Sequence, residues 1–371
     1  MQYSEGYLLD KRYRLERYVG GGSFGEVWVV MDQETDLELA VKIYSAMDEK
    51  GLEDFKKEFQ LSFELNHTNL LHANYLGVNE EDRRPYLVMP FCPDGSVSKD
   101  AGEMDETRLW RFLRDTSAGL AYLHAQNPPI IHQDIKPDNI LIAKSGDYVI
   151  TDFGISKQLR QSLRKSALSL NSAGAISYMG PERFSKNFQA VKASDIWSLG
   201  ASLYELAVGD LPFCGMGGSL QKQGADLPEL PTDFSDKLNM VCLSCMAKEP
   251  WNRPTAAQLR DYAAQVLDNK ETVITWSLSD EVAAAMKKRE EERGQASEEQ
   301  PVAAPEAIVE ESGPIVEEPE ATTDNLVASD DSGFLDPNAP KEEKSSPWGL
   351  VGSILAGLAA GCIVGLLFLD L

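Results

Sequence analysis

The residues from Ile130 to Gly154, with the sequence IIHQDIKPDNILIAKSGDYVITDFG, decide how the rest of the chain is interpreted. Two runs rich in β-branched residues, 140–142 and 148–151, flank the turn signal Lys144-Ser145-Gly146-Asp147. This pattern predicts a small hairpin, with polar residues in the loops at its two ends. Four of those polar residues are candidates for a functional site: Asp134, Lys136, Asn139 and Asp152.

The same stretch is similar to the catalytic and magnesium-binding loops of the eukaryotic-type protein kinases, which carry the patterns H-R-D-x-K-x-x-N and D-F-G. The resemblance implies that Asp134 orients a substrate hydroxyl and takes its proton, and that Lys136 places a positive charge over the transferred phosphoryl group. It also implies that Asn139 and Asp152 hold Mg²⁺, or Mn²⁺ in its place, against the phosphates of ATP, because such cations prefer oxygen ligands. Each residue alone is better explained as an ordinary polar loop residue, whereas the complete set favours catalysis.

A glycine-rich stretch at residues 19–30 reads VGGGSFGEVWVV and contains the pattern G-x-G-x-x-G. Glycines let a backbone approach phosphates closely, and dinucleotide-binding folds use the same pattern before a helix. Here residues 26–31 are β-branched and aromatic, which predicts a returning strand and a flap over ATP. The resemblance assigns nucleotide contacts in this flap to Val19, Gly20, Gly21, Gly22, Ser23, Phe24 and Gly25.

One lysine, Lys42, lies in the apolar run 39–43, which predicts a strand. A lysine among buried positions is costly unless it is paired. By its resemblance to the family pattern V-A-I-K, Lys42 is expected to bind the α and β phosphates and to pair with a glutamate on a helix. Residues 48–65 have helical spacing, and Glu58 lies nine residues before the landmark His67-Thr68-Asn69-Leu70, so Glu58 is the expected partner. A surface ion pair is the alternative for either residue alone.

Residues 86–96, YLVMPFCPDGS, resemble the hinge whose backbone binds adenine in this family. Phe91 and Cys92 are expected to supply the backbone hydrogen bonds, since Pro90 has no N–H to donate. Met89 is expected at the back of the pocket. Three apolar residues are expected above and below the adenine ring, although each alone would be ordinary core: Val27, Ala40 and Leu141.

Downstream motifs are expected to hold the scaffold together. The stretch 194–200, SDIWSLG, resembles the helix whose aspartate, here Asp195, braces the catalytic loop. Arg253 is expected to form a buried ion pair with Glu182. The resemblance implies a bilobal α+β kinase domain over residues 13–268, with a small antiparallel β lobe followed by a mainly helical lobe.

The chain departs from the family pattern at three positions. Gln133 stands where most members have an arginine that pairs with a phosphate on the activation segment, so activity is predicted not to depend on phosphorylation through this contact. Ala175 replaces a threonine that bridges to the catalytic aspartate and lysine, and Ser177 is the candidate to substitute for it. Ser62, one turn after Glu58, stands where the family places an apolar residue behind the active site.

Composition limits the classes of function. The chain has 371 residues, of which 43% are hydrophobic, enough for one two-lobed domain and a further segment. A net charge of −24 argues against nucleic acid as a partner, since that partner requires a basic face. The five cysteines form no disulfide framework and suit a reducing cytosol. Cys242 and Cys245 lie in an apolar helical pattern, which favours two core cysteines over a metal or redox site.

The C-terminal part has a different character. Residues 269–346 are acidic and rich in Pro and Ala, which predicts a disordered linker with one charged helical piece at 281–293. Between residues 290 and 346 there are seventeen Asp or Glu against three Lys or Arg. Residues 348–369 form an uncharged apolar run of 22 residues, which predicts one transmembrane helix in a lipid bilayer rather than a buried core helix.

This end of the chain also predicts a topology and a partner. Lys341 and Lys344 precede the apolar run and no basic residue follows it, so the kinase side of a single-pass C-terminal anchor is expected in the cytoplasm. The residues before the glycine-rich stretch lack the charged-then-apolar pattern of a signal peptide, so the N-terminus is expected to stay in the cytosol. Glycines at every fourth position of the run favour a homodimer, although glycine is common in membrane helices: Gly357, Gly361 and Gly365.

These features together are similar to the membrane-anchored serine/threonine kinases of bacteria. Lys136 is typical of the members specific for serine and threonine, so the expected function is transfer of the γ-phosphate of ATP to those hydroxyls in proteins, including autophosphorylation. Two alternatives stay open. One is a small-molecule phosphotransferase that uses the same acidic and amide side chains, and the other is a pseudokinase that serves as a scaffold without catalysis.

Overall fold

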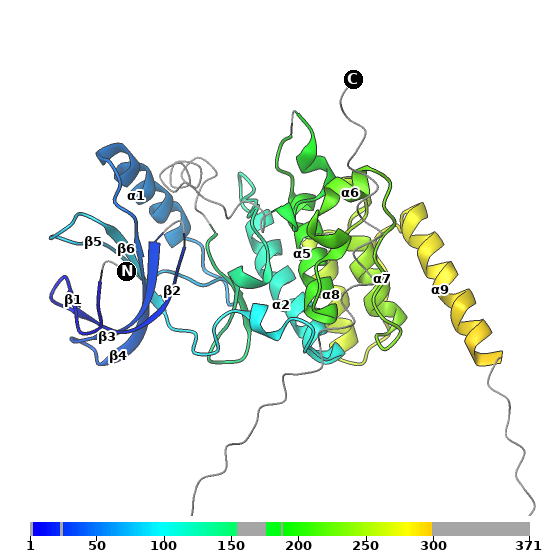
Figure 1. The fold of residues 1–371 in the computed structure, drawn as a ribbon, viewed down its shortest axis with the longest axis horizontal. Helices are drawn as coiled ribbons and strands as arrows, with labels where there is room; N and C mark the ends of the chain where they lie inside the picture. The colour runs from blue at the N-terminus through cyan, green and yellow to red at the C-terminus, as the bar shows by residue number, and fades with distance from the viewer. Residues whose placement is uncertain (1–2, 23–24, 154–175, 187, 299–371) are drawn as a thin grey trace, which may run out of the picture. The chain divides into compact units, whose positions relative to one another are not determined.

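The computed structural model describes residues 3–22, 25–153, 176–186 and 188–298. Within these ranges the chain forms an antiparallel sheet with one helix, drawn in shades of blue in Figure 1, followed by a mainly helical lobe whose colour runs from cyan through green to yellow. The predicted bilobal α+β architecture is therefore confirmed. In the described part of the chain, no helix is both long and apolar enough to cross a membrane. The predicted span at 348–369, with its repeat of Gly357, Gly361 and Gly365, lies outside the described residues.

Six antiparallel strands build the sheet of the N-terminal lobe, in the order β1-β2-β3-β4-β6-β5. Their β-branched and aromatic residues favour extended backbone, and Trp28, Val41 and Tyr86 are buried together in its core. The register places Lys42 of β4 opposite Val27 of β3 and Leu87 of β6. The strands are β1 (Leu8–Leu9), β2 (Tyr13–Gly22), β3 (Gly25–Asp32), β4 (Leu37–Tyr44), β5 (Tyr75–Val78) and β6 (Pro85–Pro90).

Helix α1 (Glu49–Phe63) follows β4 and confirms the helix predicted there. The carboxylate of Asp48 accepts a hydrogen bond from the N–H of Gly51 at 2.7 Å and so satisfies one free donor of the first turn. The ring of Phe55 lies 4.7 Å from the ring of Tyr44, measured between centroids, which docks the helix on the end of β4. The side chains of Glu58 and Ser62 are outside the described part, so the predictions for them stay predictions.

The helical lobe is built around α2 and α5. Leu109, Phe112 and Leu113 of α2 are fully buried, and so is Trp197 of α5. The helices are α2 (Glu106–His124), α5 (Lys192–Val208), α6 (Gly218–Lys222), α7 (Asp236–Cys245), α8 (Ala256–Leu267) and α9 (Asp280–Glu298), with short 3-10 turns η1 (Val97–Asp100), η2 (Pro137–Asn139), η3 (Pro181–Phe184), η4 (Pro212–Gly215) and η5 (Pro250–Asn252).

The two cysteines of α7, Cys242 and Cys245, are fully buried free thiols. Burial raises the pKa of the Cys242 thiol well above its ordinary value and that of Cys245 to about 12. A thiol that stays protonated is a poor nucleophile and a poor metal ligand. The interpretation as core cysteines is confirmed.

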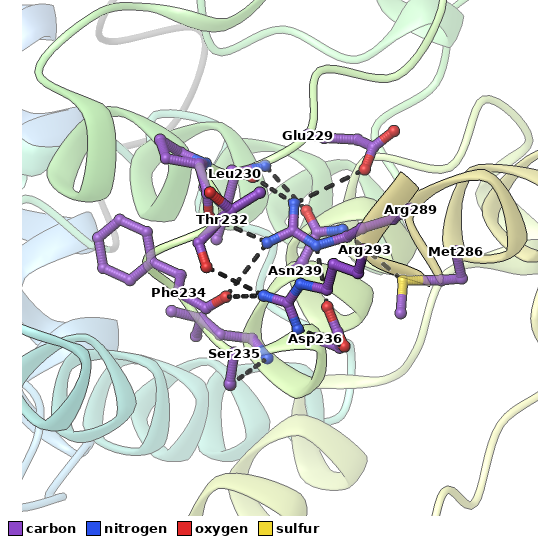
Figure 2. A network of polar contacts seen from close by, with 12 residues as sticks. Glu229, Leu230, Thr232, Phe234, Ser235, Asp236, Asn239, Met286, Arg289 and Arg293 are labelled. Carbon is purple, nitrogen blue, oxygen red and sulfur yellow. Dashed lines mark hydrogen bonds and ion pairs between the residues drawn. The ribbon is translucent and has the colours of Figure 1, made fainter. Parts of the chain in front are cut away.

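The linker predicted from residue 269 starts too early, because α9 is part of the folded lobe. Figure 2 shows Arg289 and Arg293 reaching from α9 to the segment before α7. The Arg289 side chain is only 4% exposed and donates to the main-chain carbonyls of Leu230, Pro231 and Phe234. The charged helical piece predicted at 281–293 is confirmed within α9, and its guanidinium groups dock the helix by donating to main-chain carbonyls of the segment before α7.

Candidate active site

A hairpin of β7 (Ile140–Ile142) and β8 (Tyr148–Ile150) brings the two predicted metal ligands together. Ile140 pairs with Ile150 at the open end of the hairpin, so the residues just outside it adjoin. The N–H of Thr151 donates to the carbonyl of Asn139 at 2.9 Å, and Asp152 follows directly. The predicted hairpin is confirmed, and it places an amide and a carboxylate at the same edge, as a divalent-cation site requires.

Asp134 is held beside Asn139 in the preceding loop. The side-chain amide of Asn139 donates to the carbonyl of Asp134 at 2.7 Å and to its carboxylate oxygen Oδ2 at 3.1 Å. The amide orients the carboxylate without neutralising it, so Asp134 keeps the capacity to accept a proton. The ammonium of Lys136 lies in the same loop, 3.6 Å from a carboxylate oxygen of Asp138.

Asp195, in the first turn of α5, fixes the backbone of the loop that carries Asp134. Its fully buried carboxylate accepts the N–H of His132 at 2.8 Å and that of Gln133 at 2.7 Å. The Nε2 atom of His124 lies 2.9 Å from the same carboxylate. Gln133 has a φ of +66°, a left-handed conformation that these two bonds help to maintain. The predicted bracing role of Asp195 is confirmed.

Lys42 meets the site from the other lobe. Its Nζ atom lies 2.6 Å from Oδ1 of Asp152, and both side chains are mostly buried. The pair joins the strand β4 to the loop after β8, across 110 residues of sequence. Because the side chain of Glu58 is not described, the predicted Lys42–Glu58 pair stays a prediction.

A cavity of about 290 Å³ lies between the sheet and this loop. Apolar side chains line one part of it, and Lys42, Asn139 and Asp152 line another. A flat apolar base and a polyphosphate with a divalent cation have the same division, so the residues present fit ATP with Mg²⁺. The other predicted nucleotide contacts that line the cavity are Val19, Gly20, Val27, Ala40, Phe91, Cys92 and Leu141.

The predicted flap is the turn between β2 and β3. Gly22 pairs with Gly25, so the chain returns at once as the predicted strand. Gly25 has a φ of +146°, and a Cβ atom there would lie 2.0 Å from the carbonyl oxygen of Ile43, so only glycine fits. Ser23 and Phe24 lie outside the described residues.

Sequence reasoning missed some of the lining. Leu71, Asp138 and Thr151 also face the cavity. Thr151 directly precedes Asp152, and this position next to a predicted metal ligand could have indicated that it lines the cavity. Leu71 follows the landmark after α1 by one residue and carries no chemical signal of its own. Burial raises the pKa of the Cys92 thiol, which keeps this lining cysteine protonated.

The predicted pair of Glu182 and Arg253 is confirmed behind the site. Two guanidinium nitrogens of Arg253 lie 2.8 and 3.0 Å from the carboxylate oxygens of Glu182, and the Arg253 side chain is fully buried. Burial alone would raise the pKa of Glu182, but the bonds from Arg253 and from the Ser194 hydroxyl outweigh it and hold that pKa below its ordinary value. The pair ties the segment after the activation segment to the helical lobe.

One expectation about this segment is wrong. The hydroxyl of Ser177 donates to the main-chain carbonyl of Gly215 at 2.7 Å, so Ser177 does not take over a bridge to Asp134 and Lys136. A hydroxyl has one proton to donate, and the carbonyl of a nearby loop takes it. Ala175 lies outside the described residues.

The comparisons with known proteins agree with this geometry. The family model of the protein kinase domain matches residues 13–263. The chain therefore belongs to the protein kinase family.

The relatives come from distant groups of organisms. The serine/threonine-protein kinase PknA of Mycobacterium tuberculosis is 31% identical over 258 residues, covering 66% of this chain and 58% of that protein. The calcium/calmodulin-dependent protein kinase kinase of Caenorhabditis elegans is 29% identical over 289 residues, covering 68% and 52%. The serine/threonine-protein kinase dst1 of Dictyostelium discoideum is 32% identical over 259 residues, covering 67% and 34%. The chain thus spans a third to three fifths of the length of these relatives.

Proposed function

We propose that this kinase transfers the γ-phosphate of ATP to serine and threonine hydroxyls of proteins. The observation that carries the proposal is the convergence of Asp134, Asn139 and Asp152 on one loop edge, with the ammonium of Lys42 at 2.6 Å from Asp152. Two of the relatives are named serine/threonine-protein kinases, which supports the substrate class.

The bound nucleotide takes its orientation from the two kinds of lining. Val27, Ala40 and Leu141 provide an apolar slot for adenine, and the ammonium of Lys42 lies at the polar part, where it can bind phosphate oxygens. Asn139 and Asp152 would hold Mg²⁺, which neutralises charge on the phosphates when it is bound. A base bound among these apolar side chains would exclude water from them, which would strengthen the neighbouring polar contacts.

Asp134 handles the proton of the incoming hydroxyl. The substrate oxygen forms a bond to the γ-phosphorus, the bond from that phosphorus to the bridging oxygen of ADP breaks, and the hydroxyl proton passes to the Asp134 carboxylate. Asn139 keeps this carboxylate oriented through its bond to Oδ2 at 3.1 Å. The charge of Lys136 in the same loop offsets negative charge on the transferred group.

Transfer of labelled phosphate from ATP to a mixture of casein-like proteins and, separately, to small alcohols tests the proposal. We expect label in protein serine and threonine, and a loss of at least about 10²-fold in Asp134→Asn and in Asp152→Ala. The matched control is Asp54→Asn, an exposed carboxylate on α1. Label only in small alcohols favours the phosphotransferase, and no difference between wild type and Asp152→Ala favours the pseudokinase.

We further propose that residues 348–369 anchor the kinase in a membrane, with the catalytic domain in the cytoplasm and the acidic residues before the anchor as a tether. The uncharged run of 22 residues supports the anchor, and Lys341 with Lys344 supports the orientation. Carbonate extraction of membranes tests it. The full chain should stay with the membrane, whereas a chain that ends at residue 346 should be released.

Self-association through the anchor would raise the local concentration of kinase and promote autophosphorylation between two copies. The repeat of Gly357, Gly361 and Gly365 supports this step. Replacing all three by leucine should abolish cross-linked dimers in detergent and lower the rate of autophosphorylation. Replacing Gly352, which is out of the repeat, is the matched control, and unchanged dimers in the triple variant would contradict the step.

A further inference from the structure

A turn at residues 213–218, FCGMGG, lies directly against residues 176–181. We call the first the glycine turn and the second, after the role proposed for it below, the substrate wall. Two hydrogen bonds join them. The N–H of Gly218 donates to the carbonyl of Met179 at 2.8 Å, and the hydroxyl of Ser177 donates to the carbonyl of Gly215 at 2.7 Å.

The contact is so close that only glycine fits at two positions of the turn. A Cβ atom at Gly217 would lie 2.3 Å from the carbonyl oxygen of Ile176, and one at Gly218 would lie 2.2 Å from the backbone nitrogen of Pro181. Both distances are far below van der Waals contact, and the opposing atoms are backbone rather than flexible side chain. Any larger residue must therefore move the substrate wall or the turn.

The glycine turn is itself firmly placed. The ring of Phe213 stacks on Trp197 of α5, with centroids 5.9 Å apart. Phe213 and Cys214 both have a φ of +52°, which non-glycine residues adopt only where surrounding contacts enforce it. The turn thus behaves as a fixed support rather than as a loop that yields.

The other side of the substrate wall is tied to the same helix. The hydroxyl of Ser198 donates to the carbonyl of Tyr178 at 2.6 Å, and the hydroxyl of Tyr178 donates to the carboxylate of Glu205 at 2.5 Å. The substrate wall is thus held between α5 and the glycine turn. Ser177, the candidate for a bridge to the catalytic loop, donates its hydroxyl proton to the Gly215 carbonyl of the glycine turn instead.

We propose, resting on the proposed kinase function, that Gly217 and Gly218 are positioning residues for the protein substrate. They let the glycine turn hold residues 176–181 at the distance from Asp134 at which a substrate hydroxyl is in line with the γ-phosphate. They touch neither ATP nor the reacting atoms. Their effect is therefore confined to the protein substrate. A misplacement of about 1 Å is enough to cost about 10²-fold in rate.

Gly218→Ala tests the proposal, because it adds only the Cβ atom that meets Pro181. The control is Gly224→Ala, six residues further on, where φ is +100° but no atom lies within 4 Å of the added carbon. We expect kcat/KM for a protein substrate to fall by about tenfold or more in Gly218→Ala, with the KM for ATP within about twofold of wild type. The Gly224→Ala variant should keep both constants. An equal loss in both variants, or a parallel loss of ATP binding, overturns the proposal.

Hydrogen exchange of residues 176–186 provides a measurement that needs no activity. Exchange there should become faster in Gly218→Ala and stay unchanged in Gly224→Ala. Equal exchange in the two variants would contradict the claim that the glycine turn supports the substrate wall. If Gly218→Ala does not fold, Ser177→Ala, which deletes one hydroxyl, takes its place. It should lower kcat/KM for the protein substrate to a smaller degree and leave the KM for ATP unchanged. Ser177→Thr, which keeps the hydroxyl, should restore kcat/KM. If wild type labels no protein, the proposed function fails, while the exchange result still decides whether the glycine turn supports the wall.

Discussion

The ammonium of Lys42 and the carboxylate of Asp152 lie 2.6 Å apart, so a strand of the N-terminal sheet and the loop after β8 meet in an ion pair. The loss of one partner leaves the other in a mostly buried place with one bond fewer, which is costly. We predict that Lys42→Met lowers kcat/KM by at least about 10²-fold, because the phosphates lose a cation as well. Steady-state kinetics with varied ATP measures it. Lys11→Met, an exposed lysine between β1 and β2, is the control and should keep full activity.

The pair of Arg253 and Glu182 is predicted to be a major contribution to stability. Arg253→Met should lower the free energy of unfolding by about 3–5 kcal/mol, because the Glu182 charge is then left buried without its partner. Urea unfolding followed by circular dichroism measures the difference. Arg260→Met is the matched control, since its partner Asp261 is exposed and surface pairs contribute at most about 1 kcal/mol. Similar losses in both variants would contradict the prediction.

The same pair predicts a dependence of stability on pH. The folded-state pKa of Glu182 lies below its ordinary value of 4.5, so its contribution to stability is complete above that pH and is lost as pH falls through the folded value. The difference in unfolding free energy between wild type and Glu182→Gln should therefore be largest at neutral pH and shrink below about pH 4.5. Urea titrations from pH 7 down to pH 3 give this difference. A gap that widens with acid would exclude the assignment.

Gln133 is neutral and cannot pair with a phosphate. We therefore predict that activity does not depend on a phosphate on the activation segment, residues 155–172, bound by the side chain at position 133. The backbone of Gln133 is already fixed, because its N–H donates to Asp195 and its carbonyl accepts from Arg183 at 2.9 Å. Replacing the five serines by alanine should leave activity towards an external protein within about twofold of wild type. A collapse of that activity would count against the prediction. These serines are Ser156, Ser162, Ser166, Ser169 and Ser172.

Helix α9 is predicted to be necessary for the stability of the helical lobe. Arg289→Met should destabilise the protein by about 2–5 kcal/mol, because the Leu230 carbonyl loses its donor and the carbonyls of Pro231 and Phe234 and the Asp236 carboxylate each lose one of their donors. Lys288→Met, on the exposed side of the same helix, should change the unfolding free energy by less than about 0.5 kcal/mol. A chain ended at residue 268 should melt well below one ended at residue 298. Equal melting of the two would show that the helix is dispensable.

The sequence allowed much of the site to be predicted where one residue type has few structural solutions. Gly25 faces a backbone carbonyl, and Asp195 must satisfy two amides of one loop, so both roles were readable from the motifs. The hydrogen-bond partners that were predicted wrongly are those that depend on tertiary position alone. Ser177 found the carbonyl of Gly215, which lies 38 residues away, and nothing in either local sequence indicates that meeting.

The docking of α9 on the helical lobe was not predicted, for a different physical reason. Hydrophobic periodicity reports burial of carbon, whereas α9 is held largely by guanidinium groups that bind carbonyls. Among the described side chains of this helix, Val282 is the fully buried apolar residue, and Met286 packs against the core while partly buried. An arginine that is 4% exposed looks, in sequence, like any other charged residue of a solvated helix.

The docking of α9 also orders events during synthesis of the chain. The carbonyl of Leu230 and the guanidinium of Arg289 are 59 residues apart, and the residues in between form α7 and α8. A ribosome that adds about 5–20 residues per second leaves this carbonyl without its donor for several seconds after it emerges. The helical lobe is therefore completed late, by a helix made after every catalytic residue, and a nascent chain stalled before residue 289 exposes an unfinished lobe to chaperones and proteases.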